Sequence, residues 1–105
     1  MTDILNRLAL IVAARADAPP SESHTAALLA KGRAKVAEKV GEEAIETVIA
    51  AVQDDRQAII GESADLLFHL SVLWHDAGLT PDNIDAELAR REGLSGLAEK
   101  AARKS

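Results

Sequence analysis

The sequence predicts an all-α protein, a bundle of four to five helices that forms one domain over residues 1–105. Hydrophobic residues make up 48% of the chain and aromatic ones only 2%. Ala, Leu, Val and Ile therefore supply the apolar surface, a composition that favours helices over sheets. Apolar residues also recur at helical spacing along most of the chain. A chain of 105 residues has room for a single core.

The first predicted helix runs from about Asp3 to Ala16. Its apolar residues follow the i, i+3, i+4, i+7 pattern of one helix face, and they are Ile4, Leu5, Leu8, Ile11 and Val12. The segment ADAPPSES then ends the helix, because prolines lack a backbone donor and serines favour turns and caps. Helix is predicted again from Thr25, with a bend at Gly32, as far as Gln53. The expected inward-facing residues of this second segment are Val36, Val40, Ile45, Val48 and Ile49.

A third helix is predicted to begin after the aspartates at 54 and 55 and to end at Gly78, a residue type typical of helix C-termini. This segment is apolar almost all round, which predicts that neighbours cover most of its sides. Phe68 and Trp74 are assigned to the core or to a subunit interface. In so small a domain, a second subunit would supply part of the cover, so we expect a homodimer.

A fourth helix is predicted to begin with Thr80 as its N-cap and Pro81 as its first residue. Its expected core-facing residues are Ile84 and Leu88. The final segment, EGLSGLAEKAARKS, contains two glycines and ends in basic residues, so we expect a short helix or a loose tail there.

Charge and composition argue against several classes of function. A net charge of −5 and a pI near 5.1 offer no basic surface for nucleic acid. The absence of cysteine excludes disulfides, thiolate nucleophiles and Cys-based zinc sites. The first residues lack the charged region of a signal peptide, and no apolar run reaches the ~20 residues that span a bilayer. We therefore expect a soluble, cytoplasmic protein that binds neither nucleic acid nor membrane.

Two pairs of carboxylates form the candidate site. Glu43 and Glu46 are spaced i, i+3 on the second helical segment beside Glu42, although like charges at this spacing destabilise a helix by about 0.2–0.5 kcal/mol per pair. Glu62 and Asp65 repeat the spacing on the apolar third helix, where unpaired carboxylates are costly to bury. If the two helices pack antiparallel through their short connection, these two pairs converge as four oxygen ligands.

An all-oxygen, carboxylate-rich site favours Mg²⁺, with Mn²⁺ as an alternative. Mg²⁺ in proteins is commonly completed by substrate phosphates, which makes a nucleotide polyphosphate the expected ligand. Lys35 and Lys39 precede Glu43 on roughly the same helix face, where they would contact those phosphates. His69 and His75 are interpreted as core or rim residues, because no second nitrogen ligand lies at metal-site spacing.

The motifs EAIE at 43–46 and ESAD at 62–65 resemble the E-x-x-E…E-x-x-D signature of all-α nucleoside triphosphate pyrophosphohydrolases, the group that includes MazG-like enzymes. The wider strings resemble the phosphoribosyl-ATP pyrophosphohydrolases from about Ile4 onward: SHTAALLAKGRAKVAEKVGEEAIETVIAA, ESADLLFHLSVLWHDAGL and AELARREG. The resemblance implies hydrolysis of phosphoribosyl-ATP to phosphoribosyl-AMP and pyrophosphate in histidine biosynthesis. It also implies Mg²⁺ as the cofactor and a helical homodimer.

By position, the resemblance implies that the metal ligands are Glu43, Glu46, Glu62 and Asp65. It assigns Lys35 and Lys39 to the phosphates, and the general base would be one of three glutamates, Glu42, Glu43 and Glu46. The family often has an aromatic residue in an S-Y-T segment, where this chain reads SHT. His24 and Thr25 are the corresponding candidate substrate contacts.

The residues alone leave other interpretations open. A dNTP pyrophosphohydrolase on the same scaffold would have the same metal site and a different pocket for the base and the ribose. A non-enzymatic helical dimerisation module would use its acids structurally. The glutamates at 42, 43 and 46 would then be a solvated face, and Lys35 and Lys39 would pair with Glu38, Glu42 or Glu43 along the helix.

Overall fold

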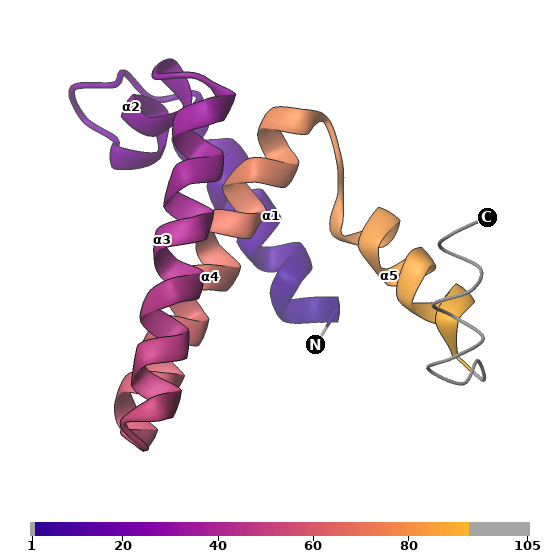
Figure 1. Cartoon of the computed structure of the whole chain (residues 1–105). Helices are drawn as coiled ribbons and strands as arrows, with labels where there is room; N and C mark the ends of the chain where they lie inside the picture. The colour runs from indigo at the N-terminus through magenta and orange to yellow at the C-terminus, as the bar shows by residue number, and fades with distance from the viewer. Residues whose placement is uncertain (1, 93–105) are drawn as a thin grey trace.

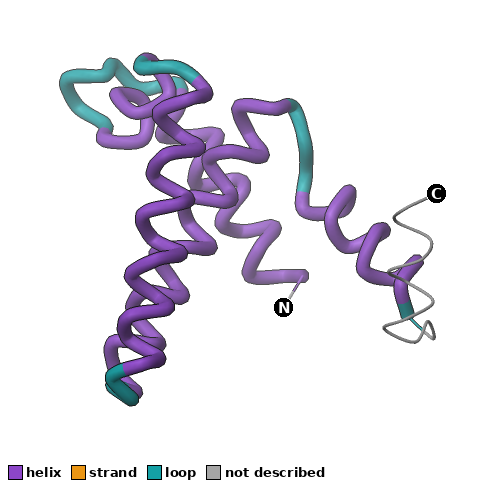
Figure 2. Tube along the Cα trace, in the orientation of Figure 1, coloured by secondary structure: helices purple, strands orange, loops and turns teal. Residues whose placement is uncertain are grey.

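The computed structural model describes residues 2–92, and this part of the chain is all-helical without a strand, as the sequence predicts. The helices are α1 (Thr2–Ala16), α2 (His24–Ala30), α3 (Arg33–Val52), α4 (Arg56–Ala77) and α5 (Pro81–Arg91) (Figure 1). Short loops join them, as the tube in Figure 2 shows. The segment from residue 93 onward, for which we expect a short helix or a tail, lies outside the described residues.

The long helices α3 and α4 form an antiparallel hairpin that turns at residues 53–55 (Figure 1). α1 packs against α2, α4 and α5. The core lies where the first four helices meet, and its fully packed residues are Val12, Leu28, Val36 and Val72. The turn end of the hairpin extends away from this core, so α3 and α4 are each other's main neighbours there (Figure 1).

Local signals set the helix ends. Asp55 is the N-cap of α4, and its side chain accepts a hydrogen bond of 3.1 Å from the backbone N–H of Ala58. Gly78 ends the same helix with a φ of 75°, which a residue without Cβ adopts at little cost. Thr80 begins α5 with a capping box to Asn83. These three ends agree with the sequence-based expectations.

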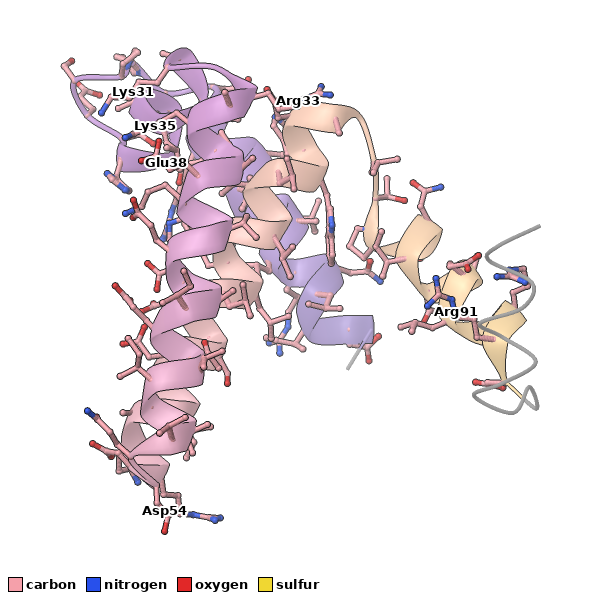
Figure 3. The ribbon with its side chains drawn as sticks, in the orientation of Figure 1. Lys31, Arg33, Lys35, Glu38, Asp54 and Arg91 are labelled. Atoms are coloured by element: carbon pink, nitrogen blue, oxygen red, sulfur yellow. The ribbon has the colours of Figure 1, made fainter. Side chains whose placement is uncertain are left out.

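The bend predicted at Gly32 is a complete break between two helices. Gly32 has a φ of 97° and serves as the N-cap of α3, so α2 and α3 are separate. The start of α3 is tied to the end of α4 by Arg33, whose Nε donates to Asp76 Oδ2 at 2.7 Å (Figure 3). This contact joins the two ends of the hairpin that lie nearest the core.

The inward face predicted for α3 is partly wrong. Ile45, Val48 and Ile49 are 62%, 60% and 50% exposed, respectively. The face of α3 that contacts α4 instead buries Glu43 and Ala50. A single chain therefore leaves an apolar stripe on α3 open to solvent.

Neighbouring helices also bury less of α4 than the sequence predicts. Its buried residues are His69, Ser71 and Val72, all in the half that α1 and α2 reach, while Ile60 near the hairpin turn is exposed. On α5, Leu88 is exposed where a core position was expected. No helix within residues 2–92 combines the length and apolarity needed to cross a bilayer.

Candidate metal and substrate site

Three carboxylates from the two long helices meet inside the hairpin. Glu43 of α3 and Glu62 and Asp65 of α4 each offer an oxygen, and these oxygens all lie within 4.8 Å of one another. Glu43 is buried, Glu62 is half-buried and Asp65 is exposed. The group, which we call the acidic cluster, therefore reaches from the hairpin interior to solvent, where a substrate can approach it.

The acidic cluster is electrostatically strained. The pKa of Glu62 is raised to about 7, mainly by a hydrogen bond with Glu46 and to a lesser extent by burial. The pKa of Glu43 is also raised, mainly by burial and to a lesser extent by a hydrogen bond with Glu46. Oε2 of Glu43 and Oε2 of Glu62 are buried without a hydrogen-bond partner among the described residues. Buried carboxylate oxygens without a donor are costly, and a hard divalent cation satisfies such oxygens, so these residues fit a metal ion.

The other two glutamates of α3 differ in position. Glu46 is exposed and is not one of the three residues of the acidic cluster, yet it is close enough to Glu62 to share a hydrogen bond with it. Glu42 accepts a hydrogen bond of 2.9 Å from Lys39 Nζ, and this bond lowers the pKa of Glu42. The structure thus brings Glu46 beside the acidic cluster and engages Glu42 with a lysine.

Each of the two lysines forms an ion pair with a glutamate three residues later on α3. Lys35 Nζ lies 3.3 Å from Glu38 Oε2 on the exposed side of α3, near the end of α2 (Figure 3). The pKa of Lys39 is raised mainly by its hydrogen bond with Glu42, and the charges of Glu43 and Glu46 add to the effect. Lys39 therefore lies near the acidic cluster. Exposed pairs of this kind contribute little to stability, so a phosphate can displace them at low cost.

The histidines of α4 agree with their interpretation as core or rim residues. His69 is buried, and its Nδ1 lies 2.8 Å from the backbone oxygen of Asp65. A carbonyl oxygen only accepts, so Nδ1 carries the proton in this bond. His75 is exposed on the last turn of the helix. Neither belongs to the acidic cluster.

A pocket of about 270 Å³ lies beside this region. It is lined by Arg15, Glu22, Ser23, His24, Thr25 and Phe68. Phe68 follows Asp65 by three residues on α4, hence by about 4.5 Å along the helix axis and on nearly the same face. The segment with His24 and Thr25, expected to contact substrate, therefore lines a pocket one helical turn from the acidic cluster. We name it the α1–α2 pocket.

The sequence did not point to the whole lining of the α1–α2 pocket. The sequence predicts no role for Arg15 and places Phe68 in the core or at an interface. Phe68 does pack against the core, but it also borders the pocket. The only sequence signal for Arg15 is its place in the last turn of the first helix, directly before ADAPPSES. A larger pocket of about 440 Å³ lies between α1 and the α4–α5 connection and contains no residue of the acidic cluster.

Comparison with known proteins gives a consistent family. The family model described as phosphoribosyl-ATP pyrophosphohydrolase matches residues 5–92. A phosphoribosyl-ATP pyrophosphatase of Azospirillum brasilense is 59% identical, over 97% of this chain and 92% of its own length. A protein of the same name from Rhizorhabdus wittichii is 59% identical, over 98% and 97%, and one from Gluconobacter oxydans is 55% identical, over 95% and 75%. The chain therefore belongs to the phosphoribosyl-ATP pyrophosphohydrolase family.

Proposed function

We propose that this protein hydrolyses phosphoribosyl-ATP to phosphoribosyl-AMP and pyrophosphate, a reaction of histidine biosynthesis. The observation that carries the proposal is the acidic cluster of Glu43, Glu62 and Asp65, gathered from α3 and α4 in a chain of this family. Substrate and product are small soluble molecules, which agrees with a cytoplasmic enzyme that has no need of a nucleic-acid or membrane partner.

Mg²⁺ is the proposed cofactor, held by the acidic cluster with Glu46 close enough to become a fourth ligand. The support is chemical: the donors are all oxygens, and Glu43 and Glu62 each have a buried carboxylate oxygen without a hydrogen-bond partner among residues 2–92. When bound, Mg²⁺ would neutralise developing charge on the phosphates and favour ionisation of the attacking water. Mn²⁺ prefers the same donors and is the alternative ion.

Among the three candidate glutamates, Glu46 is the best placed to accept a proton from the attacking water. It borders the acidic cluster and remains exposed, whereas Glu43 is buried within it. Glu42 is engaged by Lys39, which keeps its pKa low and its carboxylate a weak base. If Glu46 becomes a metal ligand instead, this role passes to Glu42, which would first leave Lys39.

Lys35 and Lys39 are the proposed phosphate contacts. Each would exchange an exposed pairing with a glutamate for a charge-assisted bond to a phosphate oxygen. Lys39 is the nearer of the two to the acidic cluster, since the charges of Glu43 and Glu46 act on it. We therefore assign Lys39 to the phosphates next to the cation and Lys35 to those further along α3.

The test of the function is pyrophosphate release from phosphoribosyl-ATP, ATP and a panel of dNTPs, with and without Mg²⁺. We expect Mg²⁺-dependent release with a strong preference for phosphoribosyl-ATP. Preference for dNTPs would keep the metal site and overturn the substrate. No release from any of these nucleotides would favour the non-enzymatic dimerisation module.

We also propose that the protein is a homodimer. Ile45, Val48, Ile49 and Val52 are all exposed, and their i, i+3, i+4, i+7 spacing places them in one stripe along α3. Ile60 of α4 is exposed on the same part of the hairpin. Contiguous apolar surface of this kind marks protein interfaces, and a second hairpin would cover it in a symmetric bundle.

A further inference from the structure

The substrate of the proposed reaction has two anionic ends. Phosphoribosyl-ATP carries the triphosphate on one ribose and a further phosphate on a second ribose, and the adenine ring separates the two. ATP and dNTPs have only the first of these ends. An enzyme that prefers phosphoribosyl-ATP therefore needs a cationic subsite for the second phosphate, apart from the acidic cluster.

The α1–α2 pocket lies close to the acidic cluster along α4. Phe68 is one turn beyond Asp65, on the side of α4 away from the hairpin turn. Lys35 and Lys39 stand on α3 and do not line the pocket, whose lining includes Arg15 of α1. A volume of about 270 Å³ is below the range of about 300–1,000 Å³ typical for whole drug-sized ligands, so the pocket suits one end of a nucleotide.

The lining of the α1–α2 pocket suits a ribose phosphate. Arg15 is exposed there and forms no ion pair within the described part of the chain, in contrast to Lys35 and Lys39. A guanidinium donates in a planar fork that matches two phosphate oxygens. Glu22 lines the same pocket with a carboxylate, an acceptor for ribose hydroxyls. Phe68 contributes an apolar wall on the side of α4.

We propose that Arg15 binds the phosphate of the second ribose, so that the α1–α2 pocket distinguishes phosphoribosyl-ATP from ATP. The inference rests on the proposed function and names the subsite that gives it specificity. Arg15 is thus a specificity-determining residue, and the triphosphate end of the substrate stays with the acidic cluster and the lysines.

The test compares Arg15→Gln with Arg15→Lys and with the control Arg7→Gln, an exposed arginine two turns earlier on α1 that does not line the pocket. KM and kcat are measured for phosphoribosyl-ATP, and ATP is added as a competitor to obtain its inhibition constant. We expect Arg15→Gln to raise KM for phosphoribosyl-ATP by about 10- to 100-fold, the range for one hydrogen bond to a charged group. The inhibition constant of ATP should stay unchanged.

Arg15→Lys should retain part of the affinity, and Arg7→Gln should behave as the wild type. Equal losses for phosphoribosyl-ATP and ATP, or no loss for either, would overturn the role of Arg15. If the wild type does not hydrolyse phosphoribosyl-ATP, the proposed function itself fails, which is a different outcome. Binding of ribose 5-phosphate to the wild type, followed by NMR, needs no variant: shifts of the amides of residues 22–25 are expected, and their absence would contradict the subsite.

Discussion

Glu43 and Glu62 show how a site can cost the metal-free protein stability. Each has a pKa raised by burial and by Glu46, and each has a buried oxygen without a donor within residues 2–92. A fold selected for stability alone would replace such carboxylates with neutral or apolar side chains. Their presence is therefore explained best by a ligand that binds the ionised form.

Substitution of Glu62 by Gln separates stability from activity. The change removes a charge that Glu46 and Glu43 repel, so the melting temperature of the metal-free protein should rise. Pyrophosphate release should fall by about 100-fold or more. Mutation of a residue that only hydrogen-bonds to a metal ligand already lowers activity by about 10- to 100-fold, and loss of a ligand itself should cost at least as much. Thermal unfolding and steady-state kinetics on the same preparation measure both effects.

Glu87→Gln is the matched control, since it also removes one glutamate charge. Glu87 pairs with Arg90 and Arg91 on α5, and its hydrogen bonds with them lower its pKa to about 2. Its ionised form is favourable, so this substitution should lower the melting temperature slightly and leave turnover intact. A Glu62→Gln protein with full Mg²⁺-dependent turnover would contradict the assignment of Glu62 as a ligand.

The raised pKa of Glu62 predicts a pH dependence of its own. In the metal-free protein this carboxyl titrates at about 7, compared with 4.5 for an ordinary glutamate. Between these values the folded state binds more protons than the unfolded state, so this group lowers stability as pH rises through that window. Mg²⁺ needs the ionised carboxylate, so its affinity should weaken as pH falls below about 7.

Calorimetric titration of the metal-free protein with Mg²⁺ measures this coupling. The experiment is repeated in buffers of different ionisation enthalpy, which gives the number of protons released on binding. Near pH 6 a carboxyl with a raised pKa is still largely protonated, so we expect Mg²⁺ to displace its proton, whereas near pH 8 we expect little release. Equal proton release at the two pH values would show that Glu62 does not titrate with the metal.

At the scale of the helices, the hairpin of α3 and α4 positions the acidic cluster, and the cap at the start of α4 contributes to the stability of this hairpin. Asp55 caps α4 through a 3.1 Å bond to Ala58. Asp55→Ala should lower the free energy of unfolding by about 1 kcal/mol, whereas Asp55→Asn, which retains an acceptor, should change it little. Urea denaturation of the two variants measures the difference.

Activity gives the second half of this prediction. Asp55 precedes Glu62 by seven residues, about 10 Å along the helix axis, so it does not contact the acidic cluster. Both Asp55 variants should therefore keep wild-type kcat at temperatures where they are folded. Loss of kcat in Asp55→Ala without unfolding would mean that fraying of the helix start reaches the ligands.

For the molecule as a whole, most of the fold could be predicted from local sequence signals. The caps at Asp55, Gly78 and Thr80 depend on neighbours within a few residues, and the sequence predicted all three. The meeting of Glu43 with Glu62 and Asp65 also followed from sequence, because a short connection forces antiparallel packing and equal spacing then aligns the pairs. Caps, the length of a connection and helical spacing can all be read from neighbouring residues in the sequence.

Features that depend on three-dimensional cover were harder to predict. Periodicity identified Ile45, Val48 and Ile49 as one apolar face, but it could not say whether the same chain or a second copy covers that face. The α1–α2 pocket could not be predicted from the sequence for a similar reason. Arg15 and Phe68 are more than fifty residues apart in sequence, and only packing of α1 against α4 brings both to one pocket.

The exposed stripe on α3 supplies the prediction for the assembly. Val52 is 81% exposed, so Val52→Glu should leave the fold of a single chain undisturbed. At a symmetric interface, however, the new carboxylates would be buried without a partner, which is strongly unfavourable.

Light scattering after size exclusion should give the wild type a mass of about twice 11.1 kDa and the variant a mass near 11.1 kDa. Ala86→Glu adds the same charge at an exposed position of α5, outside the hairpin, and should remain dimeric. A monomeric wild type, or a Val52→Glu protein that stays dimeric, would place the subunit contact elsewhere or remove it.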